Sequence, residues 1–279
     1  MQGHRTMKEK ALSYLTGLLS IFIIPYMVTV FVNGVDTALS WRTVNVENCL
    51  PVVVSLQIGP KYQKEMIKAQ AVVARSNVYR RLEQESLGHF LGEIKKQVRE
   101  VYDIWELPAP IYEKAVEETE GKILKAEGKL CLVPYHKISA GMTRDGVEAL
   151  REESYGYLKA VDSSVDREAP DYVSSIYIHE QQMPKELEIK ERDSSGYVMG
   201  LTTEGDLLEG EAFRRGLSLA SSNFSIQKMQ GEYRFLCKGK GHGLGISQYG
   251  GNQLAKEGKS CEEILKAYFP AMDVEELHD

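Results

Sequence analysis

The chain has 279 residues, 43% of them hydrophobic, which is enough to bury one large core or two moderate ones. Its formal net charge of -6 lacks the positive field on which generic nucleic-acid binding depends, so we expect no nucleic-acid partner. The four cysteines form no CxxC pair, which argues against a structural zinc module or a thioredoxin-like redox site. Buried free thiols, or one or two disulfides outside the cytoplasm, are the alternatives.

Residues 11–32 form a run of 22 residues without a charged side chain. As a helix this run would be about 33 Å long, which is enough to cross the hydrocarbon core of a bilayer. Arg5, Lys8 and Lys10 precede it, and this favours a cytoplasmic N-terminus. We predict a protein of the cell membrane with a cytoplasmic tail (1–10), a single-pass transmembrane anchor (11–32), a linker (33–43) and an extracytoplasmic body (44–279). A cleaved signal peptide is the alternative.

The first part of the body predicts a helix-rich region. Residues 44–86 indicate a short strand and turn, then a buried apolar helix or strand, then a long helix. The apolar residues of this long helix are spaced by 4, 3, 4 and 4 positions, which places them on one face: Ile67, Ala71, Ala74, Val78 and Leu82. Further helical patterns follow and are interrupted at Pro108 and Pro110.

The rest of the body predicts short strands. Residues 123–126 and 130–135 flank an EGK turn and indicate a β-hairpin that leads into a loop at His136. The mixed charges of residues 162–171 indicate an exposed connection. Strand-like runs then alternate with turns, in SSIYIHE, KELEIKER and SGYVMGLTT, before a short helix near Glu211. The fold class we predict is α+β, with one mixed body of helices and largely antiparallel strands.

The glycine-rich stretch GKGHGLGISQYGG, residues 239–251, resembles a phosphate loop only superficially. It has no Lys-Ser/Thr pair after its last glycine, and it lacks the strand-to-helix context of a dinucleotide site. Alternate glycines do allow a ligand to approach the backbone closely. The nearby side chains could supply hydrogen bonds and a ring face to a sugar chain: His242, Ser247, Gln248 and Tyr249. A glycine-rich bend whose histidine satisfies buried backbone groups is the alternative.

Four blocks of the body together resemble the stage II sporulation protein D family, which comprises membrane-tethered peptidoglycan lytic transglycosylases and amidase-enhancer relatives. The first block, residues 44–75, contains KAQAVVAR, which is similar to a family helix. The second, residues 115–146, is similar to a strand-turn-strand that enters a Ser/Gly/Thr loop. The third is GEAFRRGLSLASSNF, and the fourth, most specific block begins GHGLGISQYGG and ends with a helix. The resemblance implies a groove that holds a glycan strand.

The resemblance also implies the chemistry of a lytic transglycosylase, in which an acid protonates the glycosidic oxygen and a base then assists attack by the C6 hydroxyl of muramic acid. One carboxyl group can perform both steps. The family's catalytic glutamate precedes the KAQA helix, and the matching position in SLQIGPKYQKE is Gln57. An amide cannot act as this acid or base. Gln57 could be an engineered change or mark a natural binding-only relative, unless Glu47 or Glu65 does the work instead.

The family's second motif matches the loop that contains His136, Ser139, Gly141 and Thr143. The resemblance places this loop opposite His242, Ser247, Gln248 and Tyr249, across the glycan groove. Some relatives bind zinc beside the loop through histidine and cysteine, but HKISAGMTRDG contains no cysteine. We therefore predict no metal and no other cofactor.

Two functions follow as alternatives. The first is a membrane-anchored sporulation enzyme that cleaves glycan strands whose peptide stems have been removed, during engulfment. The second is a binding-only member or scaffold of the same family, which Gln57 favours. In both, the partners are peptidoglycan glycan strands, the membrane and other engulfment proteins. A soluble nucleotide enzyme is a distant third, because the chain has no phosphate motif.

Overall fold

The computed structural model of the protein describes residues 46–101 and 109–277. The chain divides into two compact units, residues 1–48 and residues 49–279, and the elements that follow belong to the second unit unless their bounds say otherwise. The predicted tail, the anchor at 11–32 and the linker at 33–43 lie outside the described residues. Among the described helices, none combines the length and the apolar character that a membrane span requires.

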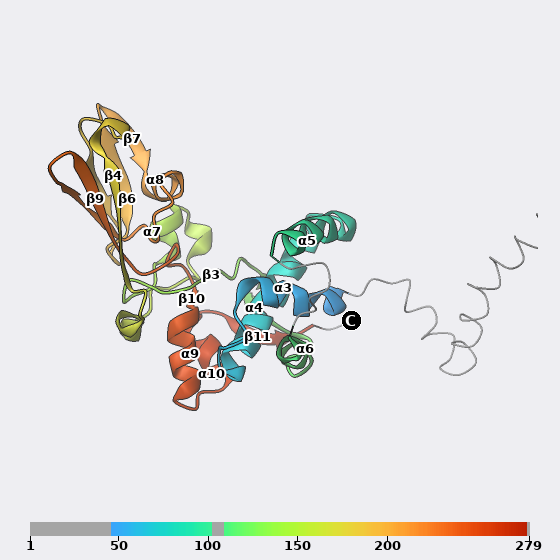
Figure 1. Ribbon diagram of the computed structural model, residues 1–279. Helices are drawn as coiled ribbons and strands as arrows, with labels where there is room; N and C mark the ends of the chain where they lie inside the picture. The colour runs from blue at the N-terminus through green and yellow to red at the C-terminus, as the bar shows by residue number, and fades with distance from the viewer. Residues whose placement is uncertain (1–45, 102–108, 278–279) are drawn as a thin grey trace, which may run out of the picture. The chain divides into compact units, whose positions relative to one another are not determined.

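The fold is a mixture of helices and antiparallel sheets, as predicted (Figure 1). Helix α4 (Lys64–Leu82) is central and packs against several other elements, namely α3 (Leu50–Gln57), α6 (Pro110–Glu117), α9 (Gln248–Lys256), α10 (Cys261–Tyr268) and β1 (Lys122–Ala126). The predicted apolar face is confirmed, because Ile67, Ala71 and Ala74 are fully buried. Burial extends beyond this face to Gln70 and Arg75, because neighbours surround the helix on several sides.

The apolar segment before α4, for which the sequence allowed a helix or a strand, is the helix α3. Pro51 lies in its first turn, where the missing N–H costs nothing, and the helix ends at Gln57, before Ile58 adopts an extended conformation. Tyr112 of α6 donates a hydrogen bond to the Ile58 carbonyl at 2.7 Å and fixes the chain just beyond Gln57. Helix α5 (Leu87–Val101) packs against α3 and buries Phe90.

The predicted hairpin is confirmed in part. Strands β1 and β2 (Lys129–Leu130) pair antiparallel around Glu127 and Gly128, which both have positive φ values, as a two-residue hairpin turn requires. The second strand is shorter than predicted, because residues 131–134 form no strand and β3 (Tyr135–His136) pairs elsewhere, parallel to β10 (Ile246–Ser247). Strand β11 (Asp273–Glu276) completes the first sheet on the other side of β1.

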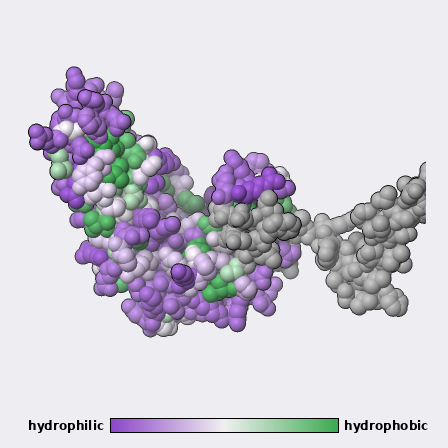
Figure 2. Space-filling model, in the orientation of Figure 1, coloured by the Kyte–Doolittle hydropathy of each residue, from purple (hydrophilic) through white to green (hydrophobic). Residues whose placement is uncertain are grey.

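Two further three-stranded antiparallel sheets contain the strands predicted after Tyr172. One has the order β4 (Val173–His179), β9 (Glu232–Lys238), β8 (Phe224–Lys228), and the other has the order β5 (Glu188–Arg192), β6 (Val198–Thr203), β7 (Asp206–Glu209). Residues of both sheets share one hydrophobic core. Phe213 of α8 (Gly210–Gly216) joins Phe224 and Phe235 there, with ring centroids 5.7 and 5.8 Å from its own. In the face viewed in Figure 2, hydrophobic residues gather over these strands, while the rest of the coloured surface is mostly hydrophilic.

The remaining elements are a five-residue helix and four short 3-10 helices: α7 (Gly146–Leu150), η1 (Val46–Cys49), η2 (Glu153–Tyr155), η3 (Ser164–Glu168) and η4 (Glu180–Gln182). The four cysteines are free thiols, of which Cys237 and Cys261 are buried and the other two half-buried. The prediction of an exposed connection at residues 162–171 is confirmed in part, because six of its ten residues are exposed, whereas Ser163, Asp166 and Ala169 are buried. Asp166 in η3 is fully buried. Its carboxylate accepts hydrogen bonds from residues of three segments, which compensate for the loss of water.

Candidate functional site

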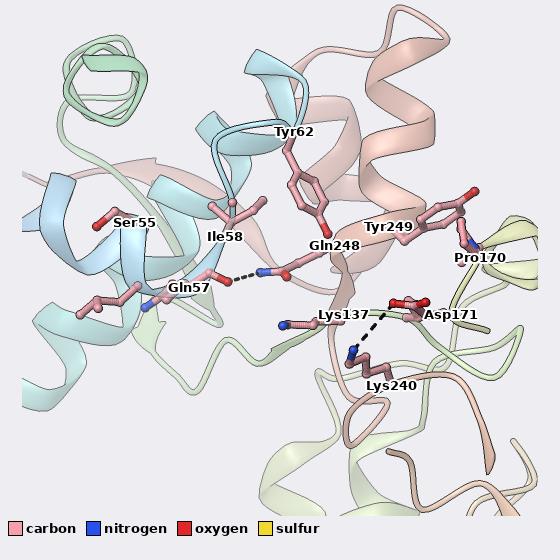
Figure 3. A pocket seen from close by; sticks show the side chains of 14 residues that line it. Ser55, Gln57, Ile58, Tyr62, Lys137, Pro170, Asp171, Lys240, Gln248 and Tyr249 are labelled. Carbon is pink, nitrogen blue, oxygen red and sulfur yellow. Dashed lines mark hydrogen bonds and ion pairs between the residues drawn. The ribbon is translucent and has the colours of Figure 1, made fainter. Parts of the chain in front are cut away.

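A pocket of about 470 Å³ lies where helix α3 ends, and we call it the Gln57 pocket. Gln57, Ile58 and Tyr62 form one wall, and the start of α9 contributes Gln248 and Tyr249. The side facing them contains Lys137, Lys240 and the segment Ala169–Asp171 (Figure 3). The pocket is therefore assembled from five separate segments of the chain.

Three glutamine side chains form a hydrogen-bonded cluster at this wall. The Nε2 of Gln70, in α4, donates to Oε1 of Gln57 at 2.8 Å. The Nε2 of Gln248 donates both to Oε1 of Gln70 at 3.1 Å and to the backbone oxygen of Gln57 at 3.0 Å. Within the described part of the chain, no protein acceptor is found for the Nε2 of Gln57. The cluster thus fixes the Gln57 oxygen and leaves its amide N–H groups free to donate to a ligand.

The start of α9 is held by its own cap. Ser247 is the N-cap residue and accepts a hydrogen bond from the Gly250 N–H. Tyr249 donates its backbone N–H to the Lys137 carbonyl at 3.0 Å, so the helix start and the 137–138 segment are bonded to one another. This arrangement positions Gln248 and Tyr249 at the pocket.

Asp166 lies behind the pocket and connects three segments. Its Oδ2 accepts the Ser139 N–H at 2.6 Å and the Ser163 hydroxyl at 3.1 Å, and its Oδ1 accepts the Ser247 hydroxyl at 2.9 Å. Burial raises the pKa of Asp166, while the hydrogen bonds from these serines act in the opposite direction. Burial, followed by the charge of Asp166, also raises the pKa of Tyr62 at the pocket wall. Asp166 therefore orients Ser247, and with it the end of α9 that carries Gln248.

His136 and His242 form a pair of rings with centroids 5.9 Å apart. The Nδ1 of His136 bonds the Leu244 carbonyl at 3.0 Å, and its buried Nε2 has no hydrogen-bond partner among the described residues. Burial, and then the neighbouring His242, lower the pKa of His136 to about 3. Burial is also the main cause of the lowered pKa of His242. Both rings are therefore neutral at neutral pH.

Two further residues of the predicted groove, Ser139 and Thr143, are buried and form hydrogen bonds with backbone groups. Ser139 accepts the Gly141 N–H through its Oγ, and Thr143 bonds Val161 with both its backbone N–H and its Oγ. Of the eight side chains predicted from the sequence to contact the glycan, three line the Gln57 pocket: Gln57, Gln248 and Tyr249. The other five are not among its lining residues: His136, Ser139, Thr143, His242 and Ser247.

The glycine-rich stretch shapes the loop behind the pocket. Gly245 has a φ of +67°, and a Cβ there would lie 2.0 Å from the Pro134 carbonyl. Gly239 has a φ of +77°, and its Cβ would lie 2.7 Å from the Ile138 carbonyl. The glycines therefore let this loop approach the 134–138 segment closely.

The charged side chains of the pocket come from residues that no sequence motif indicated. Lys137 and Lys240 line it together with Asp171, and the Nζ of Lys240 lies 3.8 Å from a carboxylate oxygen of Asp171. Asp171 is the only carboxylate among the described residues that line the pocket. The Lys-Gly-Lys pattern of residues 238–240 indicates local positive charge. Lys137 and Lys240 reach one site only because Lys240 pairs with the 137–138 segment.

The two glutamates named as substitutes for Gln57 have different surroundings. Glu65 is tied to its own region, where its Oε1 lies 2.9 Å from Lys68 and its Oε2 accepts the Cys261 N–H at 2.8 Å. It is not among the residues that line the pocket. Glu47 belongs to the first unit of the chain. Among the described residues, no three metal-ligating side chains come together.

Comparison with known proteins confirms the family resemblance. Residues 36–125 match the family model described as stage II sporulation protein, SpoIID. The chain is 29% identical to stage II sporulation protein D of Bacillus subtilis (strain 168) over 252 residues, covering 80% of this chain and 72% of the relative. The corresponding protein of Bacillus amyloliquefaciens is 27% identical over 249 residues, with the same coverage. The amidase enhancer of Bacillus subtilis is 42% identical over 50 residues, which cover 18% of this chain and 7% of that protein.

Proposed function

From its confirmed similarity to the stage II sporulation protein D family, we propose that this chain is a cell-wall protein of sporulation that binds peptidoglycan glycan strands in the Gln57 pocket without cleaving them. The short similarity to an amidase enhancer supports the cell-wall setting. The observation that carries the proposal is Gln57 itself, which lies at the pocket wall. The family resemblance implies a catalytic glutamate at this position.

Glycan cleavage requires a group that gives a proton to the glycosidic oxygen, typically worth about 10² to 10⁴ in rate. The amide of Gln57 cannot do this at neutral pH, although it can donate hydrogen bonds to a sugar hydroxyl. The cluster with Gln70 and Gln248 holds it in place for such binding. The pocket wall is therefore suited to recognition more than to acid catalysis.

The lysines of the pocket favour binding of glycan strands that carry free carboxylates. Removal of a peptide stem leaves a free carboxylate on the lactyl group of muramic acid. Lys137 is exposed, and Lys240 is only loosely paired with Asp171, so both can attract a carboxylate. We accordingly expect strands without peptide stems to bind more tightly than strands that retain them.

The test is to incubate the full chain with stem-free glycan strands and to measure both binding and the release of anhydromuramyl products. We expect binding without release for the natural chain, and release for Gln57→Glu, whose new carboxyl could accept the same hydrogen bond from Gln70. Gln181→Glu, an exposed site outside this pocket, makes the same charge change and should leave release absent. Release by the natural chain at the rate of Gln57→Glu would refute the binding-only function.

A second candidate is a lytic transglycosylase that uses a different acid. Asp171 favours it, because this carboxylate lines the pocket. Against this candidate, Asp171 is exposed to solvent and already forms an ion pair with Lys240. If the natural chain releases anhydromuramyl products and Asp171→Asn abolishes the release, this second function replaces the first.

We also propose that residues 11–32 anchor the protein in the cell membrane, with the body outside the cytoplasm. The uncharged run and the preceding basic residues support this placement. Deletion of residues 11–32 should move the protein from the membrane fraction to the soluble fraction. Retention in the membrane fraction at alkaline pH after this deletion would contradict it.

A further inference from the structure

The sheet β4–β9–β8 begins beside the Gln57 pocket. Asp171 and Lys240 form the ion pair on the pocket wall. Asp171 lies two residues before Val173, the first residue of β4, and Lys240 lies two residues after Lys238, the last residue of β9, which pairs with Val173. Gly239 donates its N–H to the Tyr172 carbonyl at 2.7 Å, so the backbone pairing continues one step toward the pocket. The pocket wall and the sheet are thus parts of one continuous pair of chain segments.

Side chains alternate along a strand, and directly paired residues point to the same face. The face that carries Val173 and Lys238 therefore continues through Ser175 and Leu236 to Tyr177 and Arg234. The opposite face carries Ile176 and Phe235, which belong to the core region. Tyr172 has the same parity as Ile176, and its hydroxyl donates to the Ala140 carbonyl, away from the outer face.

The far end of this outer face has an aromatic ring beside a fixed guanidinium group. Tyr177 is 54% exposed, and the Cζ of Arg234 lies 5.9 Å from the centre of its ring. The Nε and Nη2 of Arg234 donate to the Ser175 hydroxyl at 3.2 and 3.1 Å, and its Nη1 donates to Oε1 of Gln227 at 3.3 Å. Neutral acceptors thus hold the guanidinium, and no carboxylate among the described residues forms an ion pair with it.

Such a surface suits a polysaccharide that carries carboxylates. The ring of Tyr177 offers a flat apolar contact for a sugar, and a hydroxyl beside it. Arg234 offers a positive charge and planar donors to a carboxylate, and Lys238 and Lys240 add positive charge along the way to the pocket. Tyr177 is six positions after Asp171, which corresponds to about 20 Å along a strand.

We propose that the outer face of β4 and β9, from Val173 and Lys238 to Tyr177 and Arg234, is a second glycan-binding surface that receives the strand leaving the Gln57 pocket. This inference rests on the proposed function, because it takes its ligand from the pocket. A single glycan strand would then contact the pocket and the sheet together. Linked contacts of this kind multiply affinity for long strands and have no effect on short ones.

The experiment compares the affinity of the full chain for long stem-free strands and for a short stem-free oligosaccharide that fills the pocket alone. Tyr177→Ala and Arg234→Gln should each weaken binding of the long strands by about tenfold or more, and leave binding of the oligosaccharide unchanged. Tyr177→Phe keeps the ring and should retain most of the affinity. Leu207→Ala, an exposed apolar residue of β7 in the other sheet, is the matched control and should change neither.

The outcomes separate the two proposals. If the natural chain binds both ligands and the sheet variants bind long strands as well as it does, the second surface is refuted and the pocket function stands. If Lys137→Ala in the pocket changes nothing and the oligosaccharide does not bind, the pocket function fails, whereas weaker long-strand binding by the sheet variants still supports a sheet site. If the sheet variants alter only the oligomeric state measured by sedimentation, the face contacts a second copy and the proposal is refuted.

Discussion

Asp166 collects hydrogen bonds from Ser139, Ser163 and Ser247, and two of these donors are far from it in sequence. In Asp166→Asn, one acceptor oxygen becomes an NH2 group that faces donors, so at least one buried hydrogen bond is lost. We expect the free energy of unfolding to fall by about 1 to 3 kcal/mol, measured by urea denaturation at neutral pH. Asp162→Asn, at an exposed residue nearby, should change it by less than about 0.5 kcal/mol. Equal effects would contradict the role of Asp166.

His136 gives the stability a pH dependence of defined sign. Its pKa is lowered from 6.5 to about 3 in the folded protein, mainly by burial. Between these values the unfolded chain binds a proton at this residue and the folded chain does not, so stability is lost as the pH falls. From pH 7.5 to pH 5 the loss attributable to His136 is about 2 kcal/mol.

The measurement is urea denaturation of the natural chain and of His136→Gln at both pH values. The variant should lose less stability than the natural chain over this interval, because its residue 136 does not titrate. His242, whose pKa is also lowered mainly by burial, remains in both proteins, so the comparison reports the change made at residue 136. Gln181→Ala, at an exposed residue that does not titrate, should leave the pH dependence of the natural chain in place. The same loss in His136→Gln as in the natural chain would exclude His136 as its source.

Helix α10 is stabilised at its N-terminus by hydrogen bonds between Ser260 and Glu263. The hydroxyl of Ser260 accepts the Glu263 N–H, and the Glu263 carboxylate accepts the Ser260 N–H at 2.9 Å, which is a capping box. Ser260→Ala should therefore lower the free energy of unfolding by about 1 kcal/mol, measured by urea denaturation. Ser154→Ala removes an exposed hydroxyl that caps no helix and should have little effect. A cost no greater than that of Ser154→Ala would show that the cap is dispensable.

The sequence predicted well those elements whose conformation depends on residues close to one another in the chain. The apolar spacing of α4 and the two-residue turn between β1 and β2 are encoded within single segments. Asp166 was not predicted, because a carboxylate in a charged stretch normally lies in water, and its burial depends on serines elsewhere in the chain. The role of Gln57 came from the family motif, whereas the positions of Lys137 and Lys240 at the pocket depend on tertiary contacts that no local pattern encodes.

At the scale of the whole unit, the Gln57 pocket requires the close contact of α9 with its neighbours. A Cβ on Gly250 would lie 2.0 Å from the Tyr268 hydroxyl and 2.6 Å from the Ser163 hydroxyl. Gly250 is also bonded through its N–H to Ser247, which donates to Asp166. A side chain there must therefore displace either these buried side chains or α9 itself, and a shift of α9 would move Gln248 away from the pocket wall.

Gly250→Ala should lower the free energy of unfolding by about 1 to 3 kcal/mol and also weaken binding of stem-free glycan. Gly92→Ala is the matched control, because Gly92 is an exposed helical glycine of α5 with no atom within 4 Å of the added Cβ. Since alanine favours a helix more than glycine does, this variant should gain about 1 kcal/mol and bind glycan normally. Urea denaturation and glycan binding of both variants check the prediction. If Gly250→Ala gained stability as Gly92→Ala does, α9 would not be held against α10 and η3 as tightly as the pocket requires.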